Sequence, residues 1–244
     1  MLHPDLYPHI FTRKSIRKYT GTPLSAAQID AVRGALGGLV PLFAEERYKL
    51  VCEPENGGVL HRVYAYGEDT AGGNANIGFL LQQLDLALHG QGLGRLWFGM
   101  GKAPKDIACE PPLSYAICLK VGNAAGPLAR AGAAEFDRKP IEEVVADAGL
   151  QHAFEAVRLA PSAANSQPWR FVRAGEFIHA YRKRLGLVKA ALFGRMNQVD
   201  MGIALCHAVL GLAHEGVAVK GISADAPSPA PAPDGYVYTA AIQI

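Results

Sequence analysis

The chain has 244 residues, half of them hydrophobic, and a formal net charge of +2. This length and apolar content suffice for one large domain or two small fused ones, so a disordered chain is excluded. A charge of +2 does not supply the dense basic patch of a nucleic-acid-binding face, and no run approaches the roughly 20 apolar residues that span a bilayer.

The cysteines are dispersed and form no Cys-x-x-Cys pair; they are Cys52, Cys109, Cys118 and Cys206. Neither a zinc site nor a disulfide framework is therefore expected, and reduced thiols are typical of a cytoplasmic protein. Residues 1–15 contain no apolar signal core. We expect a soluble, cytoplasmic protein with no membrane or nucleic-acid partner.

In the first half, the pattern predicts two helices and two strands. Ser25 and Gln28 form a capping box that opens a helix, and the helix ends at the following Gly-Gly pair. Residues 48–54 predict a strand. Residues 77–94 are apolar on nearly every face and predict a buried helix, and residues 114–122 predict a second strand.

The second half repeats this order. Residues 150–159 predict a helix and residues 169–174 a strand, and residues 201–217 predict a second helix that is apolar nearly all round. Residues 236–244 predict a closing strand. Before it, the Pro/Ala run 226–235 predicts an extended surface connection, to which we assign no chemistry.

The two apolar helices align with each other at five pairs of identical residues: Gly78 with Gly202, Leu81 with Leu205, Leu86 with Leu210, Leu88 with Leu212 and Gly92 with Gly216. Apolar helices can resemble one another by composition alone. Because the flanking elements recur in the same order, we favour an internally duplicated α+β fold in which the two central helices pack together. This predicts a pseudo-dimer with halves 1–145 and 146–244.

A basic segment, Thr12 to Arg17, is the first candidate for function. In an extended conformation Arg13, Ser15 and Arg17 project to one side and Ile16 to the other. Two guanidinium groups and a hydroxyl in line suit a phosphate monoester, because arginine offers planar paired donors. The alternative is a solvated basic stretch before a helix.

A small, polar loop, Ala160 to Phe171, is the second candidate. Ser162, Ala163 and Ala164 lack bulk, so their backbone can approach a flat ligand, and Asn165 adds an amide that donates and accepts. An ordinary helix-to-strand loop is the alternative.

The third candidate is a glycine-rich segment, residues 92–101, which includes Trp97. Its glycine spacing does not make a Rossmann fingerprint, because it follows a helix instead of a strand. A metal site at His207 and His214, seven residues apart on one helix, is a further alternative, although such histidines are more often packed or exposed.

Four segments, in motif order, resemble the signatures of the FMN-dependent nitroreductase family. They are RKSIRKY (13–19), APSAANSQPWRFV (160–172), GLGRLWFG (92–99) and RKPIEEVV (138–145). The resemblance implies the nitroreductase-like α+β fold. In that family two subunits together build each of two FMN sites at a dimer interface.

This chain departs from that pattern in each half. The first half lacks the Ser and Asn of the small polar loop, and the second half lacks the basic segment. The resemblance therefore implies a single composite FMN site in a monomeric pseudo-dimer. The first half would contribute Arg13, Lys14, Ser15, Arg17, Gly99, Met100, Arg138 and Lys139, and the second half Pro161, Ser162, Ala163 and Asn165.

The resemblance also implies an enzymatic function. An FMN-dependent oxidoreductase would take a hydride from NAD(P)H at flavin N5 and pass electrons to a nitroaromatic or quinone-like acceptor. The flavin carries this chemistry, so no catalytic side chain and no metal are expected. The alternative is a flavin carrier or sensor that has lost turnover.

Overall fold

The computed structural model describes residues 2–99, 101–225 and 231–244. The predicted site residue Met100 and residues 226–230 of the predicted Pro/Ala connection lie outside the described residues.

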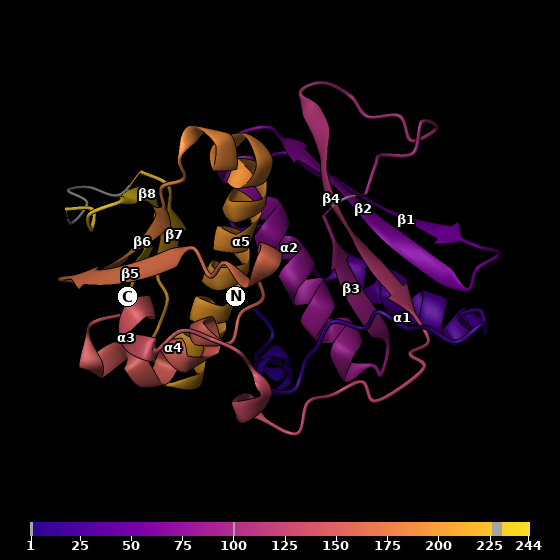
Figure 1. The fold of residues 1–244 in the computed structure, drawn as a ribbon, viewed down its shortest axis with the longest axis horizontal. Coiled ribbons are helices and arrows are strands. Elements are labelled where there is room, and N and C mark those ends of the chain that lie inside the picture. Colours follow the sequence, from indigo (N-terminus) through magenta and orange to yellow (C-terminus); the bar gives the residue numbers. More distant parts are fainter. Residues whose placement is uncertain (1, 100, 226–230) are drawn as a thin grey trace.

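Two long helices, α2 (Ala71–Gly90) and α5 (Leu187–His214), lie at the centre, with a four-stranded antiparallel sheet on either side (Figure 1). The predicted α+β class is confirmed. None of the described helices combines the length and hydropathy that a bilayer-spanning segment requires.

The first sheet has the order β1-β2-β4-β3. The Ser25 hydroxyl caps α1 as predicted, because it accepts a hydrogen bond from the Gln28 amide. A 3₁₀ helix, Pro4–Phe11, precedes the basic segment. The elements here are α1 (Ala26–Gly37), β1 (Tyr48–Glu55), β2 (Leu60–Glu68), β3 (Gly94–Phe98) and β4 (Leu113–Gly122).

The second sheet has the order β5-β6-β8-β7, which is the same arrangement in chain sequence. Both sheets also carry a register shift in their second strand, at Ala65/Tyr66 in β2 and at Ala180/Tyr181 in β6. The elements are α3 (Ile141–Val144), α4 (Gln151–Arg158), β5 (Trp169–Ala174), β6 (Phe177–Lys183), β7 (Gly221–Ser223) and β8 (Tyr236–Gln243).

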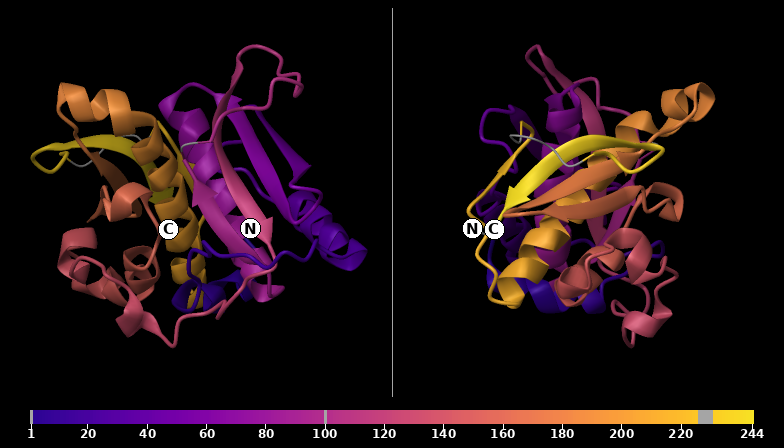
Figure 2. Two further views of the ribbon diagram at one scale, coloured as in Figure 1. Left: turned by 45° about the vertical axis from the view of Figure 1, so that its right-hand side comes forward. Right: turned by 90° about the vertical axis from the view of Figure 1, so that its left-hand side faces the viewer.

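The central helices cross at the aligned glycines. A Cβ atom on Gly78 would lie 1.9 Å from the carbonyl oxygen of Val199, and one on Gly202 would lie 1.8 Å from that of Ala75. Each glycine thus receives the backbone of the other helix, a reciprocal contact like that at a two-fold dimer axis. Figure 2 shows the helices side by side from two further directions.

Each central helix also buries a face against its own half. From α2, Ile77, Leu81 and Leu84 pack with Val63 and Leu119 of the first sheet. A larger apolar cluster joins α5 to α4 and the second sheet. This packing explains why the two helices are apolar on nearly every face.

Candidate functional site

The basic segment runs extended across the seam between the two halves. Arg13 forms an isolated bridge with Ala129, and the Ile16 amide donates a hydrogen bond of 2.8 Å to the carbonyl oxygen of Arg95. Ile16 is buried, whereas Ser15 and Arg17 are open to a cavity on the other side of the segment.

That cavity, which we call the arginine cavity, has a volume of about 610 Å³. None of the described residues that line it is acidic, so five cationic side chains face one space. Its lining consists of Arg13, Lys14, Ser15, Arg17, Arg130, Arg138, Pro161, Ser162, Ala164 and Asn165.

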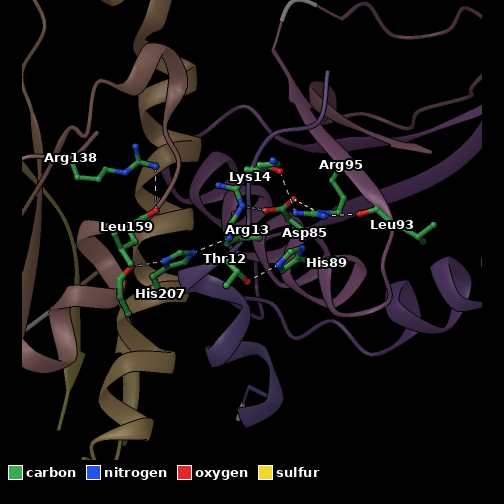
Figure 3. A network of polar contacts seen from close by, with 12 residues as sticks. Thr12, Arg13, Lys14, Asp85, His89, Leu93, Arg95, Arg138, Leu159 and His207 are labelled. Carbon is green, nitrogen blue, oxygen red and sulfur yellow. Dashed lines mark hydrogen bonds and ion pairs between the residues drawn. The ribbon is translucent and has the colours of Figure 1, made fainter. Parts of the chain in front are cut away.

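Arg13 is fixed from behind by a buried ion-pair network (Figure 3). Its Nε lies 2.7 Å from Oδ2 of Asp85, and Nε of Arg95 lies 3.1 Å from Oδ1. Burial raises the pKa of Asp85, but the two guanidinium groups outweigh burial and hold the pKa below its ordinary value. The Nη2 atom of Arg13 is buried without a hydrogen-bond partner among the described residues.

Arg138 ties the loop of the second half to the cavity. Its Nη1 donates to Oδ1 of Asn165 at 2.8 Å, and its Nη2 donates to the carbonyl oxygen of Leu159 at 3.3 Å (Figure 3). Burial, followed by repulsion from Arg13 and Arg130, lowers the pKa of Arg138 to about 10. A bound anion would relieve this crowding of positive charge.

The loop itself holds a strained backbone. Ala164, Asn165 and Gln167 have φ angles of 51°, 55° and 45°, in the left-handed region that disfavours side chains. The Ser162 hydroxyl accepts a hydrogen bond of 2.9 Å from the Gln167 amide and closes the turn. Strain of this kind persists where neighbouring contacts enforce it, often at ligand sites.

A second cavity of about 450 Å³, the apolar cavity, adjoins the first. The two share Ser15, Arg17, Pro161, Ser162 and Ala164, so a ligand with a charged end and a flat apolar end fits across both. The remaining lining is Leu96, Trp97, Phe98, Gly99, Ile117, Ala163, Phe193, Met196, Val199, Asp200 and Ile203.

Most of the predicted site residues thus lie around two joined cavities. Lys139 is not among the described lining residues of either one. Its Nζ donates to the carbonyl oxygen of Gln167 at 3.1 Å and its backbone amide to Oε1 of Gln167 at 2.9 Å, so it holds the end of the loop.

The sequence analysis missed Arg130, the strand residues of the apolar cavity and the α5 residues that line it. Arg130 lies in a segment without regular structure and no pattern singles it out. Asp200 did carry a signal, since it is an ionisable residue in an otherwise apolar helix.

The histidines of the alternative metal site do not converge. His207 is buried, with Nδ1 2.7 Å from the carbonyl oxygen of Ala156 and Nε2 2.9 Å from the side-chain amide of Gln82. His214 stacks on Tyr7 with ring centres 3.9 Å apart. Across the described part of the chain, no group of three His, Cys, Asp or Glu side chains could hold a metal ion.

Comparison with known proteins agrees with the fold. The crystal structure of a protein described as a "putative nitroreductase" from Thermotoga maritima MSB8 covers 98% of this chain and 93% of its own, with 19% identity and a TM-score of 0.67. A nitroreductase from Desulfitobacterium hafniense DCB-2, solved with bound FMN, covers 57% of this chain and 100% of its own, with 11% identity and a TM-score of 0.44.

No curated protein sequence matches the chain. The family model described as "Putative TM nitroreductase" matches residues 5–212. The protein therefore belongs to this nitroreductase family.

Proposed function

We propose that the protein is an FMN-dependent NAD(P)H oxidoreductase that binds one flavin per chain between its two halves. The observation that carries this proposal is the pair of joined cavities, one lined by five cationic and no acidic described residues and the other mainly apolar. Membership of a nitroreductase family supports the reaction class.

The arginine cavity fits the phosphate of FMN. Arg13 holds a buried, unpartnered Nη2, and Arg138 and Arg130 have pKa values lowered first by burial and then by Arg13. A phosphate dianion satisfies these donors, and each charge-assisted hydrogen bond contributes roughly 1.5–3 kcal/mol. Asp85 keeps Arg13 ionised and oriented, because it accepts the opposite edge of that guanidinium group.

The apolar cavity fits the flavin ring. Its volume lies in the range of ordinary ligand pockets, and the small residues Ser162, Ala163 and Ala164 bring backbone to its wall. Gly99, at the end of β3, is the described backbone position that we assign to the polar edge of the ring. Phe193 and Met196 of α5 form apolar lining that excludes water from it.

When bound, FMN supplies the hydride-accepting position N5 that this reaction class requires. The chain's own residues then position the donor and the acceptor in turn over the apolar cavity. NAD(P)H as donor and a nitroaromatic or quinone-like acceptor follow from the family and from the apolar lining. No protein side chain needs to carry a proton in this scheme.

The test is an absorbance spectrum of the purified protein, followed by anaerobic addition of NAD(P)H and then of a quinone. We expect a flavin band that NAD(P)H bleaches and that the quinone restores. A protein that binds no FMN, even after incubation with excess, contradicts the proposal. Bound flavin that NAD(P)H does not bleach indicates a carrier or sensor instead.

A further inference from the structure

Asp200 lies on the face of α5 that lines the apolar cavity, and its side chain is only 3% exposed. Both of its carboxyl oxygens lie within hydrogen-bond distance of the Ala163 amide, at 3.0 and 3.2 Å. Asp200 thus connects the central helix to the strained loop that both cavities share.

The first half carries out the same task with a neutral side chain. In the helix alignment Asn76 of α2 is the counterpart of Asp200. Oδ1 of Asn76 accepts hydrogen bonds from the amides of Leu42 and Phe43, at 2.7 and 3.3 Å, in the loop before the first sheet. An amide therefore suffices to anchor such a loop, which makes the ionisable group of Asp200 an additional feature.

No compensating cation reaches Asp200. Among the described residues it forms no ion pair, in contrast to Asp85, which two arginines neutralise. Arg17 is the one charged side chain besides Asp200 that lines the apolar cavity, and the other arginines face the adjoining cavity. An unpaired buried carboxylate is costly, so the neutral form is favoured.

We propose that Asp200 is a positioning residue that works as a neutral acid: its protonated carboxyl group anchors the Ala163 loop for flavin binding, and loss of that proton weakens binding. The proposal rests on the proposed flavin site. A flavin ring over the apolar cavity shields Asp200 further from water, so the charged form is disfavoured more strongly in the complex than in the free protein.

The electrostatics agree with this geometry. Burial raises the pKa of Asp200 to about 8, and the hydrogen bonds from the Ala163 amide and the Ser166 hydroxyl, which favour the charged form, offset burial only in part. The folded protein therefore retains a proton that the unfolded chain loses above its ordinary pKa of about 4. Between these values, the free energy of unfolding falls as pH rises.

The experiment compares the wild type with Asp200→Asn, which the Asn76 arrangement shows to be compatible with an anchored loop. FMN affinity is measured by flavin fluorescence from pH 7 to pH 9, and thermal unfolding of the flavin-free protein from pH 5 to pH 8. We expect the wild-type Kd to rise several-fold above pH 8 and its melting temperature to fall with pH. Both trends should flatten in the variant.

Asp106→Asn is the control, because it removes the same charge from an exposed position and should retain the wild-type trends. Arg138 is present in every variant, so its own titration cancels from the comparison. Equal pH trends in the wild type and Asp200→Asn overturn the proposal. If FMN fails to bind at every pH, the proposed function and the flavin step fall together, and the unfolding measurement still decides whether Asp200 keeps its proton.

Discussion

Arg138 connects the parts of the candidate site through one side chain, since it faces the arginine cavity and also donates to Asn165 of the loop. We expect Arg138→Ala to weaken FMN binding about 10- to 100-fold, because one charge-assisted contact is lost. Riboflavin, which lacks the phosphate, should bind the variant and the wild type within about twofold in the same fluorescence titration.

Arg33→Ala is the matched control, since Arg33 is exposed on α1 and pairs only with the neighbouring Asp30. An equal loss of FMN and riboflavin affinity in Arg138→Ala would contradict a phosphate role. Arg13 is less suitable for a simple truncation, because its removal leaves Asp85 with one arginine and also tests folding.

Ala164 is a residue whose backbone conformation is unfavourable for its side chain, with φ of 51°. The left-handed conformation costs about 1–2 kcal/mol for alanine, and glycine loses about 0.5–1 kcal/mol through its freer unfolded state. We expect Ala164→Gly to raise the free energy of unfolding by about 0.5–1 kcal/mol in urea denaturation. Ala31→Gly, within helix α1, should instead lower it by about 1 kcal/mol, and a loss in both variants would argue against strain at Ala164.

Single residues were predictable where a pattern marked them. The alternation of the basic segment indicated that Arg13, Ser15 and Arg17 would share a side, and all three line one cavity. The sequence could not indicate that Asp85 lies behind Arg13 or that Lys139 binds Gln167, because both contacts depend on how distant segments fold together.

The crossing of α2 and α5 makes the sharpest prediction about elements. Gly202→Ala places a methyl group where the carbonyl oxygen of Ala75 lies, so we expect a loss of about 1–3 kcal/mol in the free energy of unfolding. Gly194→Ala, on the same helix, meets nothing within 4 Å and should be neutral or stabilising by up to about 1 kcal/mol. Urea denaturation of both variants tests this, and equal effects would mean that the crossing tolerates side chains.

Apolar pattern predicted the existence of the central helices better than their ends. The predicted helix 77–94 starts at Ala71 and ends at Gly90. Gly92, with φ of 74°, follows a helix end at which β3 begins two residues later and pairs with β4, a long-range pairing that periodicity does not reveal. Similarly, α5 begins at Leu187, before the predicted residue 201, because its first turns are largely exposed and lack a buried stripe.

Four strands, β2, β3, β6 and β7, were also absent from the sequence prediction. Most of β2 and β6 is buried, and a short apolar run in a buried strand lacks the alternation that distinguishes it from a helix. The order of elements nevertheless repeated in the sequence, so the duplicated architecture could be predicted without them.

At the scale of the whole molecule, the two halves are unequal at the positions where a flavin would lie. Leu42 and Phe43, held by Asn76, are 8% and 4% exposed and pack in the core, whereas Ser162 and Ala163 line the cavities. We expect FMN to saturate at one molecule per chain in a titration followed by absorbance and protein concentration. Saturation at two per chain would contradict closure of the first half.

The reciprocal glycine contact between α2 and α5 has a consequence for genetics. When identical subunits meet across a two-fold axis, one codon change alters both sides of the axis together. Here Gly78 and Gly202 are separate codons, so either side of the helix crossing can vary while its counterpart stays the same. Pairs such as Asn76 and Asp200 are free to specialise independently, one for structure and the other for chemistry.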